Sequence, residues 1–92
     1  MKESAVEKYL HERITEIGGT TRKWVSTNRC GVPDRICILP PGFVFFVEVK
    51  TDVGKLSVRQ TREIASLKEL GCLVYVVQGR EGVDAMMREV GR

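Results

Sequence analysis

The sequence predicts an α/β fold in which a mixed central β-sheet is flanked by helices. Residues 43–50 are apolar on both faces over most of their length, which is typical of a central strand covered by other elements. A helical segment then separates this strand from a second continuous apolar strand at 73–77. A strand, a helix and a strand in this order favour a right-handed parallel crossover within one sheet.

The chain has 92 residues, of which 42% are hydrophobic and 29% are charged, and these proportions favour one small globular domain over residues 1–92. They exclude a disordered or fibrous chain. The longest uncharged stretch, 36–47, is too short to span a bilayer and contains two prolines and a glycine. The N-terminus lacks the pattern of a secretory signal. We therefore expect a cytoplasmic protein that is neither secreted nor bound to a membrane.

The cysteines argue against a disulfide framework and against a zinc site. There are three of them, at positions 30, 37 and 72, with no C-x-x-C pair, and His11 is the single histidine. An odd number of widely spaced cysteines is typical of a protein from a reducing compartment.

The first predicted element is a helix over residues 4–17. Ser4 and Glu7 have the spacing of a capping box, and Leu10, Ile14 and Ile17 continue an apolar stripe at helical spacing. Two glycines, at 18 and 19, end the helix, because glycine readily takes the left-handed conformation of helix ends.

Three strands are predicted next. Residues 23–26 form a short strand, and a polar loop at 27–33 leads to a second strand at 35–39. Pro40-Pro41-Gly42 is a turn signal that joins this strand to 43–50 as a β-hairpin.

The remaining elements complete the order α-β-β-β-α-β-α. Ser57 is a suitable N-cap for a second helix that ends at Gly71, with apolar positions at Ile64, Leu67 and Leu70. The strand at 73–77 follows. A terminal helix is predicted over 82–90, with its apolar face built from Val83, Met86, Met87 and Val90.

The hairpin brings two acids and a lysine together. If residues 40–42 form the turn, Leu39 faces Phe43 and the same register places Asp34 opposite Glu48. Lys50 lies two residues beyond Glu48, so strand alternation points it to the same face. A register shifted by one residue would separate the acids.

Two opposed carboxylates repel each other and call for a cation, and hard oxygen ligands suit Mg²⁺ or Mn²⁺. Such an ion activates a bound water and stabilises charge on a phosphodiester, while Lys50 is suited to orient the water or offset phosphate charge. A surface salt bridge at a strand end is the alternative interpretation of the same residues.

Gly31-Val32-Pro33-Asp34, followed by Glu48-Val49-Lys50, resembles the active-site signature of the PD-(D/E)xK nuclease superfamily. The G-x-P-D form resembles the VRR-NUC (virus-type replication-repair nuclease) family in particular. Gln60, Leu67 and Gly71 are similar to that family's Q-x6-L-x3-G pattern on the helix after the catalytic strands. The resemblance covers about residues 3–77 and implies a restriction-endonuclease-like αβββαβ core. We expect a prokaryotic, viral or phage setting for the protein.

The resemblance also implies roles for individual residues. Glu7 would assist metal or water binding, although it is also the capping-box partner of Ser4, and Gln60 would line the site, although it is also suited to a solvated first helical turn. The implied metal ligands are Asp34, Glu48, Glu7 and the backbone carbonyl of Val49, and the implied catalytic residues are Lys50, Asp34, Glu48 and Gln60.

Positive charge is concentrated in the middle of the chain. The whole chain has a formal charge of +3, but residues 20–62 have eight basic and three acidic residues, a net charge of +5. Basic residues near the proposed site are suited to neutralising DNA phosphates. The candidate DNA-binding residues are Arg22, Lys23, Arg29, Arg35, Lys55, Arg59 and Arg62.

The function that these features favour is a metal-dependent endonuclease that cuts branched DNA. Through the resemblance, we expect an enzyme like a Holliday-junction resolvase, and the two-fold symmetry of a four-way junction favours a homodimer. Either the terminal helix, with Met86 and Met87, or an edge of the sheet is expected to form the interface. The alternatives are a non-catalytic DNA-binding or scaffolding module of the same fold, and a flap-specific or sequence-specific nuclease.

Overall fold

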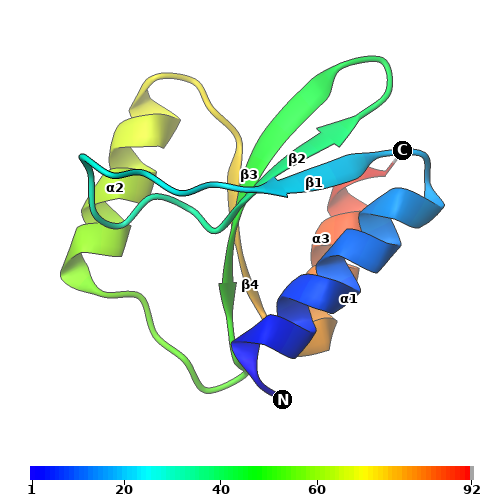
Figure 1. The fold of residues 1–92 in the computed structure, drawn as a ribbon, viewed down its shortest axis with the longest axis horizontal. Coiled ribbons are helices and arrows are strands. Elements are labelled where there is room, and N and C mark those ends of the chain that lie inside the picture. Colours follow the sequence, from blue (N-terminus) through cyan, green and yellow to red (C-terminus); the bar gives the residue numbers. More distant parts are fainter. Residues whose placement is uncertain (92) are drawn as a thin grey trace.

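The computed structural model describes residues 1–91 and has the α/β fold that the sequence predicts (Figure 1). Arg92, the last residue of the predicted domain, lies outside the described residues. The elements are α1 (Glu3–Glu16), β1 (Thr20–Lys23), β2 (Arg35–Leu39), β3 (Phe43–Lys50), α2 (Val58–Glu69), β4 (Val74–Gln78) and α3 (Gly79–Val90).

The strands form one mixed sheet in the order β1-β2-β3-β4. β1 and β2 are antiparallel, as are β2 and β3, whereas β3 and β4 are parallel and are connected through α2. In Figure 1, α2 lies on one side of the sheet and α1 and α3 lie on the other. Each helix therefore covers only one face of the sheet.

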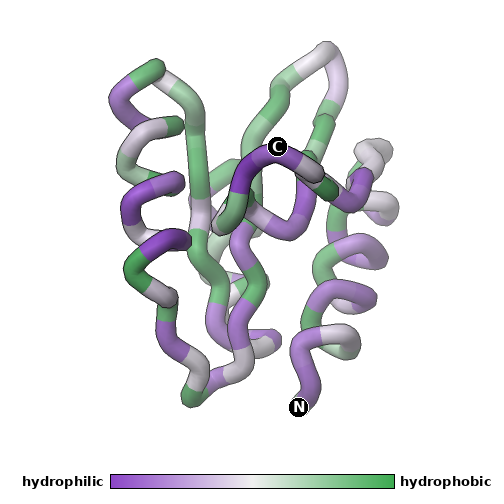
Figure 2. The backbone as a smooth tube through the Cα atoms, turned by 60° about the vertical axis from the view of Figure 1, so that its left-hand side comes forward, coloured by the Kyte–Doolittle hydropathy of each residue, from purple (hydrophilic) through white to green (hydrophobic). Residues whose placement is uncertain are grey.

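The hydrophobic core lies between the sheet and the pair α1 and α3. In Figure 2 hydrophobic residues follow the central strands, while α1 alternates between hydrophilic and hydrophobic residues along its length. Phe45 is fully buried in this core, and its ring meets that of Tyr75 edge to face at a centroid distance of 5.6 Å. The core is formed by Val6, Leu10, Ile14, Cys37, Leu39, Phe45, Val47, Val49, Val77, Val83, Met86, Met87 and Val90.

The hairpin has the register that the turn length predicts. Leu39 pairs with Phe43 and Arg35 with Val47, so the next position along β2 puts Asp34 opposite Glu48. Asp34 directly precedes β2, and its carbonyl accepts a 2.9 Å hydrogen bond from the backbone amide of Trp24. The predicted register is confirmed.

α1 begins one residue earlier than predicted, at Glu3 instead of Ser4. Lys2, without a side-chain hydrogen bond, occupies the N-cap position, and Ser4 lies inside the first turn, so there is no capping box between Ser4 and Glu7. The buried face of α1 consists of Val6, Leu10 and Ile14. The apolar stripe therefore runs through residue 6, and Glu7 lies at the edge of this face.

The short strand predicted at 23–26 is also wrong, because β1 consists of residues 20–23. Thr20 pairs with Ile38 and Lys23 with Arg35, so pairing with β2 determines the position of β1. Trp24 leaves the strand and packs against Phe46 at a ring centroid distance of 5.2 Å.

α2 begins at the predicted N-cap, Ser57, but buries less apolar surface than its sequence predicts. Only Glu63 and Ile64 are buried on this helix, and Leu70, a predicted core position, is 79% exposed. Contacts other than apolar packing are therefore needed to position α2 on the sheet.

α3 begins three residues earlier than predicted, and its methionines are not free to form an interface. Met86 and Met87 are both buried against the core of the same chain. The interpretation that they supply a dimer interface is therefore wrong. No helix within residues 1–91 is long and apolar enough to cross a lipid bilayer.

We expect Phe45→Ala to lower the free energy of unfolding by about 3–5 kcal/mol, because it removes a fully buried ring and leaves a cavity. Urea denaturation would measure this change. Val44→Ala is the matched control, since Val44 is the neighbouring residue on the other face and is 46% exposed. Equal losses for the two variants would contradict the placement of the core.

Candidate active site

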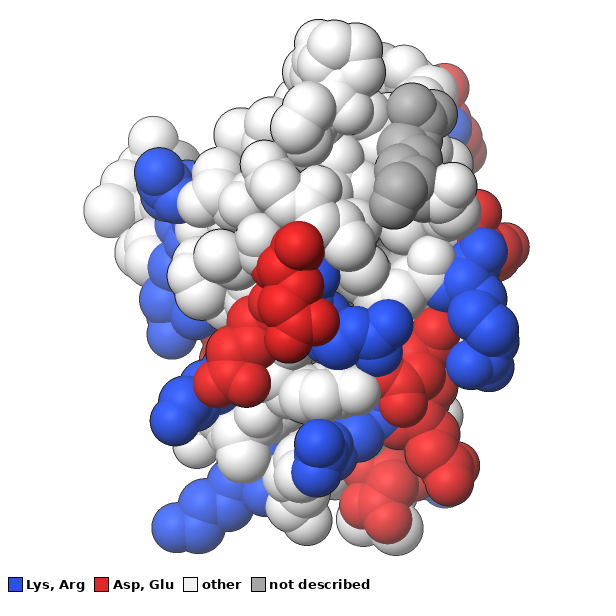
Figure 3. Space-filling model, turned by 90° about the vertical axis from the view of Figure 1, so that its right-hand side faces the viewer, with Lys and Arg blue, Asp and Glu red and all other residues white. Residues whose placement is uncertain are grey.

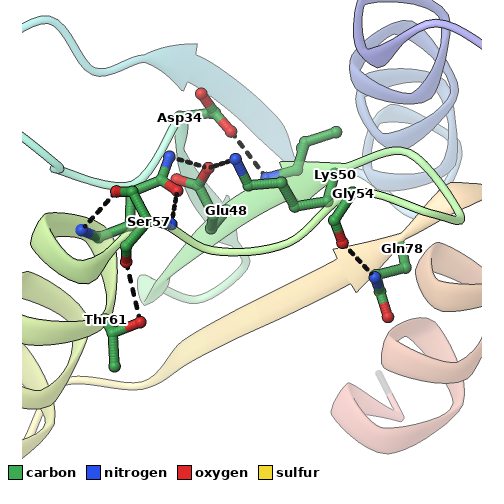
Figure 4. Close-up of polar contacts among 9 residues, drawn as sticks. Asp34, Glu48, Lys50, Gly54, Ser57, Thr61 and Gln78 are labelled. Atoms are coloured by element: carbon green, nitrogen blue, oxygen red, sulfur yellow. Dashed lines mark hydrogen bonds and ion pairs between the residues drawn. The ribbon is translucent and has the colours of Figure 1, made fainter.

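Asp34 is held in place by contacts of the loop before β2 and by a hydrogen bond from β3. Its Oδ2 accepts a hydrogen bond from the Val49 amide at 2.7 Å (Figure 4). Gly31 has a φ of +85°, and a Cβ at this position would lie 2.9 Å from the backbone carbonyl of Arg59 in α2. Pro33 is fully buried. Because the loop lies directly against α2 and is fixed by proline, the Asp34 carboxylate is positioned beside β3.

Glu48 is a buried carboxylate on the central strand. The residue is 1% exposed, and its Oε2 accepts a 2.9 Å hydrogen bond from Gln60 Nε2 and lies 3.6 Å from Lys50 Nζ (Figure 4). Within residues 1–91, the other oxygen, Oε1, is buried and has no hydrogen-bond partner. An unpartnered buried carboxylate oxygen is costly, so this atom favours a cation or a water next to it.

The surroundings of Glu48 raise the pKa of its carboxyl group to about 7. Burial is the main cause, because it disfavours the charged form, and the negative charge of Asp34 acts in the same direction. The positive charge of Lys50 opposes both effects and does not cancel them. Near neutral pH, Glu48 is therefore divided between its protonated and ionised forms.

The first turn of α2 fixes the orientation of Gln60. Ser57 Oγ accepts from the Gln60 amide at 3.1 Å, and Gln60 Oε1 accepts from the Ser57 amide at 2.9 Å, which is a complete capping box. Because Oε1 is used in the cap, Nε2 is left to donate to Glu48. The alternative of a merely solvated Gln60 is wrong. The S-x-x-Q spacing of Ser57 and Gln60 is the sequence signal for this capping box, whereas the prediction from the sequence assigns Ser57 only as a helix N-cap.

The structure does not place Glu7 with the two other carboxylates among the predicted ligands. Its Oε1 accepts from Arg35 Nε at 2.9 Å, and both side chains are largely buried. In the part of the chain that the structure describes, no group of three or more His, Cys, Asp or Glu residues is arranged to hold a metal. The candidate site therefore has two carboxylates, and a metal role for Glu7 stays a prediction.

Known proteins resemble this chain in sequence and in fold. The sequence profile of the VRR-NUC domain matches residues 1–81. The chain belongs to the VRR-NUC family. A relative described as "Putative nuclease p44", from Acyrthosiphon pisum secondary endosymbiont phage 1, is 41% identical over 81 residues, which cover 88% of this chain and 87% of the relative. A solved structure described as "VRR_NUC domain" is 37% identical, with a TM-score of 0.88 over 98% of this chain and 97% of that one.

The VRR-NUC fold does not gather all the predicted DNA-binding residues on one surface. Arg35 is tied to Glu7, and adjacent strand residues Arg22 and Lys23 point to opposite faces of the sheet. The face of α1 and α3 carries positive and negative side chains intermixed (Figure 3). Four exposed basic residues lie instead on α2 or in the segments that adjoin it: Arg29, Lys55, Arg59 and Arg62.

A hollow of the VRR-NUC domain lies elsewhere, between β4 and α3. Its volume is about 490 Å³, and its lining includes Asp52, Glu81 and Glu89 but none of Asp34, Glu48 or Lys50. The acid pair therefore lies outside this hollow, whose acidic lining disfavours a polyanion.

We expect the metal-free protein to lose stability as the pH rises from about 4.5 to about 7. The ordinary pKa of Glu48 is 4.5 and its folded-state pKa is about 7, so the folded state binds more protons than the unfolded state in this range. Glu48→Gln should remove this dependence and raise stability at pH 8 by on the order of 1–3 kcal/mol. Urea denaturation in EDTA at several pH values tests this, and parallel profiles for the two proteins would contradict it.

Ser57→Ala should act on both the helix and the site. Loss of the N-cap should lower the free energy of unfolding by about 0.5–2 kcal/mol, and Gln60 should lose the constraint that directs Nε2 toward Glu48. We therefore expect weaker binding of Mn²⁺ by calorimetry. Thr61→Ala is the control, because Thr61 Oγ1 donates only to the Ser57 carbonyl; equal Mn²⁺ affinity in all three proteins would contradict the role of the cap.

Proposed function

We propose that this VRR-NUC domain is a metal-dependent endonuclease that hydrolyses phosphodiester bonds of DNA. The observation that carries the proposal is the buried Oε1 of Glu48, which has no hydrogen-bond partner within residues 1–91. The Glu48 side chain lies on the same face as Asp34, and its other oxygen, Oε2, lies 3.6 Å from Lys50 Nζ. A surface salt bridge has no need for a second carboxylate, Asp34, opposite the buried Glu48. A divalent cation explains both acids.

The residues present fit Mg²⁺ or Mn²⁺. Asp34, Glu48 and the backbone carbonyl of Val49 are the proposed ligands, and all are hard oxygen donors. When bound, the ion supplies Lewis acidity that lowers the pKa of a water and stabilises charge on the phosphodiester. Both Mg²⁺ and Mn²⁺ tolerate a small number of carboxylates and keep waters that substrate oxygens replace.

The other site residues have supporting roles. Lys50 Nζ lies 3.6 Å from Glu48 Oε2, and its proposed role is to orient the attacking water or to offset the charge of the phosphate. Gln60 holds one oxygen of Glu48, and the Val49 amide holds one oxygen of Asp34. With one oxygen of each acid fixed by the chain, the other is left for the metal.

The proposed substrate is branched DNA, such as a four-way junction, cut by a homodimer in repair or recombination. The exposed basic residues on and beside α2 support a long polyanionic substrate. A C₂ dimer would match the symmetry of a junction. Because the apolar face of α3 is buried in the core, an edge of the sheet, at β1 or β4, is the proposed interface. Three free cysteines and the phage relative support a cytoplasmic location in a bacterial or phage setting.

Purified protein should cut synthetic junctions with Mg²⁺ or Mn²⁺ and should not cut them in EDTA. Flaps and plain duplexes, tested beside junctions, would show whether the enzyme is instead flap-specific or sequence-specific. Binding without cleavage under every condition would favour the non-catalytic DNA-binding or scaffolding module. Sedimentation with and without a junction would test the homodimer.

Asp34→Asn should reduce single-turnover cleavage by more than about a hundredfold and abolish Mn²⁺ binding, because it removes a proposed ligand. Lys50→Gln should reduce cleavage by a similar factor but retain Mn²⁺ binding. Lys8→Gln, on the exposed surface of α1, is the matched control and should cut at the wild-type rate. Wild-type cleavage by Asp34→Asn would refute the metal assignment.

A further inference from the structure

An ion pair connects the loop that carries Asp34 to the middle of α2. Arg29 Nε lies 2.6 Å from Glu63 Oε1. The two partners differ greatly in exposure: the Glu63 side chain is 8% exposed, whereas the Arg29 side chain is 64% exposed. Glu63 is therefore a nearly buried carboxylate whose charge is met by an arginine at the surface.

The contact uses only one edge of the arginine. A guanidinium has five N–H donors, and the Nε contact leaves the edge with both Nη atoms available. Among residues 1–91, Arg29 makes no other hydrogen bond or ion pair. Its exposed side chain thus has a fixed inner edge and an unused outer edge, and this fork is suited to bidentate binding of a phosphate.

The arginine lies close to the proposed metal site. Glu63 follows Gln60 by three residues on α2, a spacing that puts their Cβ atoms roughly 5–6 Å apart, and Gln60 contacts Glu48. Gly31, two residues after Arg29, would contact the backbone of Arg59 and Gln60 if it carried a Cβ. Arg29 therefore reaches solvent next to the helical turn that holds the catalytic carboxylate.

Two other arginines on α2 provide a comparison. Arg59 and Arg62 are exposed, and within the described part of the chain neither has an ion-pair partner. Their flexible side chains supply general attraction for DNA, but binding a phosphate would require each to lose side-chain entropy. Arg29 has already lost part of this freedom through Glu63.

We propose that Glu63 is a positioning residue, which holds Arg29 so that its outer edge binds a DNA phosphate beside the metal site. This proposal rests on the proposed nuclease function, because it assigns a contact for the same substrate. It makes Arg29 a specific phosphate ligand and separates it from the other basic residues. Glu63 itself does not touch the DNA.

Binding of a four-way junction in EDTA, measured over a range of salt concentrations, tests the proposal without cleavage. Arg29→Gln should weaken binding and reduce the slope of log K against log salt by about one. Glu63→Gln, which keeps the side-chain volume, should weaken binding about three- to tenfold. In the Arg29→Gln background the same change at Glu63 should have no further effect.

Controls separate positioning from general damage. Asp84→Asn removes the carboxylate of another ion pair, with Arg13 between α1 and α3, and should leave junction binding unchanged. Mn²⁺ affinity by calorimetry should be equal in wild type, Glu63→Gln and Arg29→Gln, because neither residue is a proposed ligand. A loss of Mn²⁺ affinity in Glu63→Gln would show that Glu63 maintains the metal site and would overturn the proposal.

Tighter or unchanged junction binding by Glu63→Gln would also overturn it, because Glu63 would then only neutralise Arg29. If Glu63→Gln does not fold, Arg29→Lys is the second test, because lysine provides a cation for Glu63 but lacks a second edge of N–H donors. Junction binding by Arg29→Lys should then fall as it does in Arg29→Gln. Wild-type affinity of Arg29→Lys for the junction would refute the proposal. Coupled binding without metal-dependent cleavage would instead refute the nuclease function alone.

Discussion

The buried carboxylate of Glu48 is the constraint on which the arrangement of the site depends. A charged group on a central strand loses its hydration and must be met by donors or cations from its surroundings. Lys50 comes from the same strand, but Gln60 comes from α2, and the opposing Asp34 comes from the loop before β2. The hairpin turn, the loop and the crossover helix therefore all converge on one side chain.

One face of the sheet carries the apolar core, and the other face carries the candidate active site. Strand alternation sends Phe45, Val47 and Val49 toward α1 and α3, where they form the apolar core, and sends Glu48 and Lys50 toward the other face. α2 covers that second face with little apolar burial of its own. Its position depends on the close backbone contact at Gly31 and on polar contacts to Glu48 and Arg29, so the same contacts that place α2 also shape the site.

Local rules predict the parts of this structure that depend on neighbours in sequence. Turn length determines the register of Asp34 and Glu48, and a serine before a helical stretch identifies the cap at Ser57. The sequence could not determine features that depend on distant partners. The phase of α1 depends on the core and on the pairing of Glu7 with Arg35, and the strand β1 is positioned by β2. In the sequence, Glu63 looks like an ordinary solvated acid of a polar helix, because its partner Arg29 is 34 residues away along the chain.

The raised pKa of Glu48 has two opposing consequences for cation binding at the proposed metal site. Burial and Asp34 favour the protonated acid, so at neutral pH a cation must compete with a proton for this carboxylate. The same burial strengthens the attraction between the ionised acid and any cation beside it, because little water screens the charges. Lys50 reduces the pKa shift without removing it. An empty, ionised site is therefore costly, and a divalent cation bound at the proposed site would offset this cost, so that metal binding would be coupled to the stability of the fold.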